Sequence, residues 1–563
     1  MKAVLGVLWL AAMPAWADGG DLLSACEKAE GDGAIKICTE AVNASKDDDL
    51  VQALFYRSQL YSQVDRDDDA LADLNRALKL KPDEPALVTR RCKVWYWKNE
   101  YQKAIADCDR AITLKQANFD AFLFRATAYD DSGDHKKAIA DYTEALKINP
   151  SSADAFNNRG VAHKALDEYD LALADYDQAI KLDSNIGVFY GNRCYVWYLK
   201  SEWQKARADC DEGIRLDPKS AFIWANRGNI NDDSGDHARG VEDFTKAIAL
   251  DPKNATYYAY RALAYDNLDQ YDKAFVDANM ALKLDPESAY AYNARGNINF
   301  NSGKTDAALT DYNKAIAISK DYATAYRNRC NVWLRKKDYG KAIADCDTSI
   351  KLDASDYYAW INRANAYDES GEHLRAIADF DQAIKLDGNQ PGAYNDRGVA
   401  YRTMGQVDFA LADFNAALKL KPDYRWALRN RCEVYYSRGD YPRALENCNT
   451  ALKIEPVWTD ALNVRGNVYA EMKEHAKAVA DFTEAIRIDP AYDLAYYNRA
   501  ISYDALGDKA KALADYDKAV SLDPKHAAAL YNRGLLKKEM GDTKGSEADI
   551  EKARKIDPNI GKE

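Results

Sequence analysis

Ten cysteines form the most regular set of reactive side chains in this chain of 563 residues. Thiols at fixed spacings can bind a soft metal ion or oxidise to disulfides. The sixteen-residue gap that recurs here is not a metal-ligand spacing, and no histidine accompanies each couple, so we expect disulfides and no metal. The couples, in chain order, are Cys26 and Cys38, Cys92 and Cys108, Cys194 and Cys210, Cys330 and Cys346, and Cys432 and Cys448.

An arginine and an aspartate recur with a period of 34 residues. Cutting the sequence every 34 residues from Val51 gives fifteen gapless units that end at Ile560. Position 7 is arginine in all fifteen units, and position 23 is aspartate in fourteen, with Asn447 as the exception. A guanidinium can grip a carboxylate through two parallel hydrogen bonds, so we expect an internal ion pair in each unit, such as Arg91 with Asp107. The alternative is that these arginines bind an anion. Because the arginine occurs in every unit, a structural role is favoured.

The spacing of apolar and small residues predicts two helices in each unit. Positions 4, 7, 8 and 11 share one face of a first helix, and positions 20, 24 and 27 share one face of a second. Position 8 is always small, and positions 20 and 27 are alanine in thirteen units each. A turn such as Ser132-Gly133-Asp134 separates the two helices. Because one pair cannot bury its apolar face alone, neighbouring pairs must stack.

This pattern resembles the tetratricopeptide repeat (TPR) family, which has small residues at positions 8, 20 and 27 of a 34-residue unit. The departure is position 7, where the family usually has leucine. The resemblance implies an all-α fold, a right-handed TPR superhelix (α-solenoid) of fifteen repeats with a cap at each end. We assign an N-terminal capping helical hairpin to 18–50, repeats 1–7 to 51–288, repeats 8–15 to 289–560 and a tail to 561–563.

Within such a repeat, positions 8 and 24 face each other where the two helices cross. Most units place a small residue opposite a ring there, and four units place two cysteines. We therefore predict that each sixteen-residue couple bridges the helices of one repeat, and that Cys26 and Cys38 bridge the capping hairpin. Each closure should stabilise the fold by about 3 kcal/mol.

The first seventeen residues have the pattern of a signal peptide. Lys2 precedes a short apolar run at 4–12, and Ala15-Trp16-Ala17 is a small-x-small cleavage pattern. We therefore expect a periplasmic or secreted protein, cleaved near Ala17, in a compartment where disulfides persist. The alternative is a lipoprotein, because residues 23–26 resemble a lipobox. No later stretch is apolar enough to span a membrane.

Charge and motif content narrow the function classes. The chain has 77 basic and 90 acidic residues, a formal net charge of −13, and no basic stripe. These features disfavour nucleic acid and anionic membranes as partners, while a basic or neutral polypeptide fits. The sequence has no glycine-rich phosphate loop, nucleophile motif or metal signature, so we expect no enzyme activity, catalytic residue or cofactor.

Position 6 supplies candidate binding residues. In the family, positions 2, 5, 6, 9, 12 and 13 of the first helices line a concave groove. An asparagine amide can donate and accept at once, as a peptide backbone requires. The pattern resembles the asparagine ladder of O-linked N-acetylglucosamine transferases, which holds extended polypeptide; the alternative is that these amides are simply solvated. The eight are Asn158, Asn192, Asn226, Asn328, Asn362, Asn430, Asn498 and Asn532.

Aromatic residues at the groove positions offer a second kind of contact. Rings are common anchors for protein partners, they can also stack on sugars, and the remaining alternative is that they pack between repeats. The rings are Tyr96, Trp97, Tyr195, Tyr198, Phe222, Tyr290, Tyr358, Trp426 and Tyr436. We therefore predict a non-enzymatic interaction scaffold of the bacterial envelope that binds a protein or extended peptide. The alternative is a polysaccharide-binding or polysaccharide-export accessory protein.

Two local patterns remain. His135, His237, His373 and His475 share position 17, beside acidic turns that could bind a cation, although the spacing matches no standard calcium loop. Arg327, Asn331 and Asn362 resemble the first half of the carboxylate clamp of heat-shock co-chaperones. Gly392 and Asp396 stand where the clamp needs basic residues, so we do not expect capture of a C-terminal carboxylate.

Overall fold

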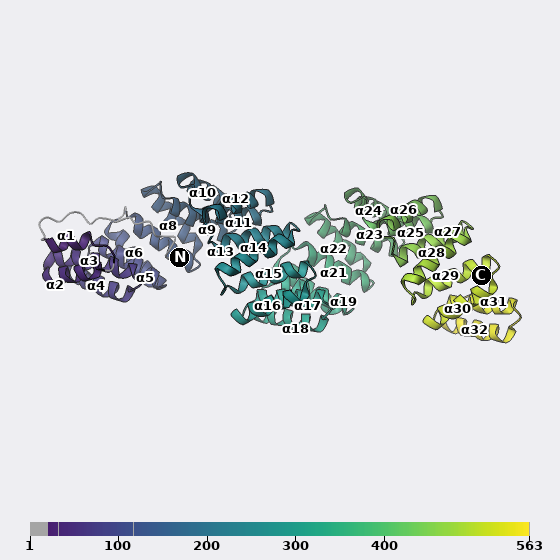
Figure 1. Cartoon of the computed structure of the whole chain (residues 1–563). Coiled ribbons are helices and arrows are strands. Elements are labelled where there is room, and N and C mark those ends of the chain that lie inside the picture. The colour runs from purple at the N-terminus through teal and green to yellow at the C-terminus, as the bar shows by residue number, and fades with distance from the viewer. Residues whose placement is uncertain (1–20, 32, 116–117, 562–563) are drawn as a thin grey trace. The chain divides into compact units, whose positions relative to one another are not determined.

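The computed structural model describes residues 21–31, 33–115 and 118–561, which form 32 α-helices and no strand (Figure 1). The predicted signal peptide lies outside the described residues. The chain divides into two compact units, residues 1–286 and 287–563. In both units each helix packs against the next one along the chain. The predicted all-α solenoid of helical hairpins is thereby confirmed.

The sixteen helices of the first unit are α1 (Asp21–Glu27), α2 (Ala34–Ala44), α3 (Asp47–Gln63), α4 (Asp67–Leu80), α5 (Pro85–Trp97), α6 (Tyr101–Leu114), α7 (Phe119–Asp131), α8 (His135–Ile148), α9 (Ala153–Ala165), α10 (Tyr169–Leu182), α11 (Gly187–Leu199), α12 (Trp203–Leu216), α13 (Ala221–Asp233), α14 (His237–Leu250), α15 (Ala255–Asn267) and α16 (Tyr271–Leu284).

The sixteen helices of the second unit are α17 (Ala289–Asn301), α18 (Thr305–Ile318), α19 (Ala323–Arg335), α20 (Tyr339–Leu352), α21 (Tyr357–Glu369), α22 (His373–Leu386), α23 (Pro391–Thr403), α24 (Val407–Leu420), α25 (Arg425–Ser437), α26 (Tyr441–Ile454), α27 (Thr459–Glu471), α28 (His475–Ile488), α29 (Asp493–Ala505), α30 (Lys509–Leu522), α31 (Ala527–Glu539) and α32 (Thr543–Ile556).

One backbone conformation recurs at the turn inside every repeat. Position 15 has a positive φ in all fifteen repeats, from Asp65 at 58° to Gly541 at 93°. Eight repeats place glycine there, which adopts this region without steric cost. The other seven accept a side chain in the left-handed region, as at Asn99 and Lys337. This shared turn sets the same hairpin geometry in each repeat.

The helices of a repeat approach closely where position 8 faces position 24. A Cβ built on Gly296 would lie 2.5 Å from Cε1 of Tyr312, and one on Gly228 would lie 2.6 Å from Cε1 of Phe244. Both rings are almost fully buried. A ring at position 24 therefore requires a residue with little or no side chain opposite it.

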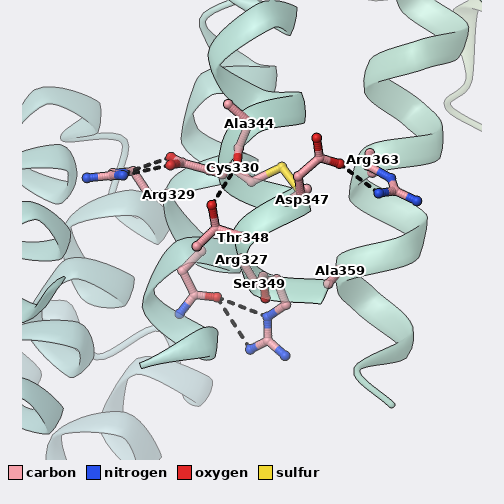
Figure 2. Close-up of a disulfide and its surroundings, with 12 residues drawn as sticks. Arg327, Arg329, Cys330, Ala344, Asp347, Thr348, Ser349, Ala359 and Arg363 are labelled. Carbon is pink, nitrogen blue, oxygen red and sulfur yellow. Dashed lines mark hydrogen bonds and ion pairs between the residues drawn. A yellow bond between two sulfur atoms is a disulfide. The ribbon is translucent and has the colours of Figure 1, made fainter. Parts of the chain in front are cut away.

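Paired cysteines occupy the same crossing in four repeats. The structure joins the ten cysteines in the five expected pairs, and the described residues contain no free cysteine. The Cα atoms lie 5.4–5.6 Å apart in the repeats and 4.6 Å apart between Cys26 and Cys38. Figure 2 shows the disulfide of Cys330, which links α19 to α20. The sulfur of Cys26, which the lipobox alternative would lipidate, is bonded to Cys38 in this structure.

Candidate protein-binding face

We use the name first-helix face for positions 2, 5, 6, 9, 12 and 13 of the first helices, within each compact unit separately.

The position-7 arginines hold these helices in place. Fourteen of them donate from Nε and Nη2 to both oxygens of the position-23 aspartate, as Arg363 does to Asp379 at 2.7 Å. The aspartates are buried, whereas the arginine side chains are 13–27% exposed. The predicted internal ion pair is confirmed.

The same arginines also join neighbouring repeats, which the sequence analysis did not anticipate. Nη1 of Arg363 donates at 2.6 Å to Asp347, at position 25 of the preceding repeat (Figure 2). Arg159 reaches Thr143 in the same way at 3.1 Å, and Arg57 reaches Thr39 of the cap at 3.2 Å. Position 25 is Asp, Asn, Thr or Glu in every repeat. One guanidinium therefore fixes both the hairpin and its stacking on the previous hairpin.

The electrostatics of the pair follow from this geometry. Burial lowers the pKa of Arg363, but the hydrogen bonds and charges of Asp379 and Asp347 outweigh burial and raise it overall. Arg431 faces Asn447 in place of a carboxylate, and burial lowers its pKa. The position-7 arginines and position-23 aspartates bond to one another and are not free to bind a partner. The first-helix face is therefore the candidate binding site.

Most amides of the predicted ladder are partly engaged between repeats. The Nδ2 atoms of six of them donate to the preceding repeat, four to an asparagine side chain at position 5, one to a backbone carbonyl and one to a tyrosine hydroxyl. Examples are Asn192 with Asn157 at 2.9 Å and Asn498 with Asn463 at 2.9 Å. The others are Asn226, Asn328, Asn430 and Asn532. These amides therefore help to set the stacking of the first helices.

The availability of the amides differs along the face. Asn226 and Asn430 are only 4% and 6% exposed, because a neighbouring repeat covers them. The prediction that these two amides contact a ligand directly was therefore wrong. Asn158 accepts from Asn157 at 3.1 Å and is half-buried. Asn362 is half-buried and makes no hydrogen bond within the described part of the chain. Binding through the accessible amides stays a prediction.

The aromatic residues fall into two groups. Tyr96 is 5% exposed and donates to Asp131 at 2.8 Å, so the expectation that it lines an open groove was wrong. Tyr198 makes the equivalent bond to Asp233 at 2.7 Å, but it remains half-buried. Both bonds span 35 residues, one repeat plus one position, so these two tyrosines pack between repeats.

The second group reaches the surface. Tyr358 is 59% exposed and Trp426 is 43% exposed. Trp426 stacks edge-on against the buried Trp458, with ring centroids 4.9 Å apart, so a rigid base supports an accessible ring. Tyr436 is half-buried beside Tyr441. Such supported rings are suited to anchor a partner.

Trp97 belongs to a cluster of two cations and two rings in the first unit, formed by Arg90, Lys93, Trp97 and Phe124. The guanidinium of Arg90 lies 5.1 Å from the Trp97 ring, and Nζ of Lys93 lies 4.7 Å from the Phe124 ring. Burial lowers the pKa of Arg90 to about 10 and that of Lys93 to about 8. No other repeat has a basic residue at position 6 or 9, so the face is not uniform in charge.

The histidine turns are engaged in local hydrogen bonds. Nδ1 of His135 lies 2.7 Å from Asp130, and His237 and His373 lie 2.6 Å from Asp232 and Asp368. Nδ1 of His475 is buried without a hydrogen-bond partner in the structure. Across residues 21–31, 33–115 and 118–561, no group of three or more histidine, cysteine or acidic side chains is arranged to hold a metal ion.

Two hollows in the described surface lie away from these residues. One open depression of about 430 Å³ is lined by Arg465, Asp481 and Glu484 among others, and another of about 390 Å³ lies on α32. Neither includes a residue of the first-helix face. In the part of the chain that the structure describes, no helix is both long and apolar enough to cross a membrane.

The geometry defines a solenoid of stacked helical hairpins that presents a face of amides and rings. Matches to the family described as tetratricopeptide repeat cover 153–186, 223–254, 244–275, 357–390, 391–424, 459–492, 494–526 and 527–560. The family described as TPR repeat matches 126–167 and 296–337. Together these matches cover more than half of the chain, which belongs to the tetratricopeptide repeat family.

The comparison with solved structures agrees on the fold. A chain in the crystal structure of the APC/C hetero-tetramer Cut9–Hcn1 superposes with a TM-score of 0.52 at 15% sequence identity. The match covers 83% of this chain and 98% of that one. At this identity the likeness concerns fold alone. The search of curated proteins gave no match. As a member of the tetratricopeptide repeat family, the protein is a repeat scaffold of the kind that binds protein partners.

Proposed function

We propose that the protein is a non-enzymatic adaptor of the bacterial envelope that binds an extended polypeptide or partner protein on its first-helix face. The single observation that carries this proposal is the pairing of exposed, rigidly backed rings with accessible amides on the same face. Tyr358 and Trp426 supply the rings, and the half-buried Asn362 supplies an amide. Rings give a partner buried area, and amides match the donors and acceptors of its backbone.

The cysteine pairs and the leader sequence support the location. Five disulfides persist only in an oxidising compartment, and residues 1–17 have the composition of an export signal. We propose that the mature chain begins after Ala17 and folds in the periplasm or outside the cell.

Affinity capture with paired baits tests the proposal. The oxidised protein and its Tyr358→Ala/Trp426→Ala variant are each used as bait in an envelope extract. The matched control is Leu374→Ala/Phe409→Ala, which removes two apolar side chains that are 70% and 61% exposed on second helices. We expect one dominant protein that binds the wild type and the control at least tenfold better than the first-helix variant. Equal capture by all three baits would contradict binding on this face.

A second function, binding of polysaccharide, is favoured by one observation. Tyr195 and Tyr198 stack with ring centroids 6.0 Å apart, and the 37% exposed Phe222 lies 6.5 Å from Tyr195. Adjacent rings of this kind offer a platform for the apolar face of sugars. Analysing the captured material for glycans distinguishes the two functions, since a bound glycan that is lost with Phe222→Ala would favour the second.

A further inference from the structure

One repeat of the second compact unit carries a carboxylate on the first-helix face where other repeats carry an amide. Asp396 occupies position 6 of α23, the position that is asparagine in eight repeats. Its Oδ1 accepts a hydrogen bond from Nδ2 of Asn395 at 3.0 Å. Among the described residues no cation forms an ion pair with it, and the charge of another acid, Asp368, acts on it. The carboxylate is half-buried and has no cationic partner among the described residues.

Open space adjoins this carboxylate on its own helix. Gly392 precedes Asp396 by four residues, so the two positions lie on the same side of α23. It is the one glycine at position 2 of any repeat. A Cβ built on Gly392 would meet nothing within 4 Å except the hydroxyl of Tyr424, at 3.6 Å. The missing side chain thus leaves room beside Asp396.

Tyrosine rings border the same place. The Tyr424 hydroxyl lies beside Gly392. Burial, and next the charge of Asp396, raise the pKa of Tyr357 and Tyr424, so both phenols stay neutral. The Tyr357 ring packs edge-on against Tyr358, with centroids 5.2 Å apart. Neutral aromatic rings around a carboxylate favour an organic cation, through ring faces as well as charge.

A chain of hydrogen bonds fixes the orientation of Asp396. Arg429 donates to Oδ1 of Asn430 at 3.0 Å, Asn430 donates to Oδ1 of Asn395 at 3.0 Å, and Asn395 donates to Asp396. Each amide uses its carbonyl on one side and its NH₂ group on the other. The relay occupies Oδ1 of Asp396, and no described residue donates to Oδ2.

We propose that Asp396, Gly392 and Tyr424 form a socket for one cationic side chain, lysine or arginine, of a polypeptide bound on the first-helix face. This inference rests on the proposed function and specifies the partner's chemistry. The ammonium or guanidinium enters the space above Gly392 and donates to Oδ2 of Asp396, while tyrosine rings cover its stem. A metal ion is a poorer occupant, because the described residues bring no group of three or more acidic, histidine or cysteine side chains together here.

Selection of peptides tests the socket. Random short peptides displayed on phage are selected on the oxidised full-length protein and, in parallel, on its Asp396→Asn variant. Asparagine is the commonest residue at position 6, so this variant keeps the fold. The matched control is Asp154→Asn, which removes a carboxylate from the first-helix face of the other compact unit. We expect the wild type and the control to enrich peptides with one recurring Lys or Arg, and the Asp396→Asn protein to lose that enrichment.

A titration then measures the contact itself. In the selected peptide the basic residue is exchanged for citrulline, which keeps the shape of arginine without its charge. We expect about tenfold weaker binding to the wild type and an unchanged affinity for Asp396→Asn. Peptides selected without a basic residue, or an equal citrulline effect on both proteins, would overturn the socket while leaving the scaffold function in place. If no peptide is selected by any of the proteins, both proposals fail.

Discussion

Arg431 donates one hydrogen bond from Nε to Oδ1 of Asn447, at 2.7 Å, where the other fourteen repeats have a two-bond pair of arginine with aspartate. Nδ2 of Asn447 turns away and donates to the carbonyl of Arg443 at 2.7 Å. Burial then lowers the pKa of Arg431, whereas Arg397 of the preceding repeat has a raised pKa beside Asp413. The twelfth repeat therefore has the weakest form of the contact that fixes every hairpin.

Restoring the carboxylate should strengthen this repeat. We expect Asn447→Asp to raise the opening free energy of α25 and α26 by about 1 kcal/mol, because it adds a charge-assisted hydrogen bond and gives up the bond to Arg443. Hydrogen exchange of the backbone amides of these helices measures the change. The reverse substitution Asp413→Asn should lower the opening free energy of the eleventh repeat. No change in either repeat would contradict a stabilising role for the pair.

Replacing the arginine with the family's usual leucine should be costly. Arg363→Leu leaves Asp379 buried without its partner and removes the bond to Asp347, so we expect a loss of about 3 kcal/mol. The double variant Arg363→Leu/Asp379→Leu removes the stranded charge and should recover much of that loss. Chemical denaturation followed by circular dichroism compares the three proteins. A double variant that is less stable than the single one would refute the argument.

The disulfides and the glycine–ring pairs should be interchangeable solutions at the helix crossing. We expect Cys330→Gly/Cys346→Tyr to fold and to become insensitive to reductant in that repeat, because it copies the fit of Gly296 and Tyr312. Cys346→Tyr alone should lose about 2 kcal/mol, since the remaining thiol meets the ring. Thermal unfolding with and without reductant shows both effects. Equal stability of the two variants would mean that the crossing tolerates added volume.

The Asp396 carboxylate should make stability depend on pH. Its pKa is raised to about 6, chiefly by burial; the hydrogen bond from Asn395 lowers it in part and the charge of Asp368 adds to the rise. The raised pKa means that folding favours the protonated acid, so the protein loses stability as the pH rises from about 4 to about 6, and this loss remains at higher pH. Tyr357 and Tyr424 remain neutral in this range. We therefore expect Asp396→Asn to stabilise the protein by about 1 kcal/mol at pH 7.5 and to have no effect at pH 4. Denaturation curves at the two values check this, and a constant difference would contradict it.

The periodic sequence was enough to predict the helical hairpins, the crossing of positions 8 and 24 and the partner of each position-7 arginine, because all three depend on contacts inside one repeat. Contacts between repeats were missed. The third bond of Arg363 to Asp347 had a signal, since position 25 carries an acceptor in every repeat. A search for apolar periodicity does not reveal it.

The binding residues were harder to predict for the same reason. Asn430 and Tyr96 have the residue type and repeat position expected of a binding residue. Both are buried, and each donates a hydrogen bond to an adjacent repeat. Burial depends on how far one hairpin slides over the next, and a 34-residue period contains no information on that offset. Tyr358 and Trp426 remain accessible because they lie at position 2, close to the start of the first helix.

Site-specific photo-crosslinking tests the central claim most directly. A photoreactive phenylalanine is placed at position 358 or 426 on the first-helix face, or at position 374 or 409 on exposed second-helix surface of the same compact unit. After irradiation in the envelope of living cells, we expect a discrete crosslinked polypeptide from positions 358 and 426 and none from 374 and 409. Crosslinks that arise only from 374 and 409, or equally from all four positions, would contradict a protein-binding first-helix face.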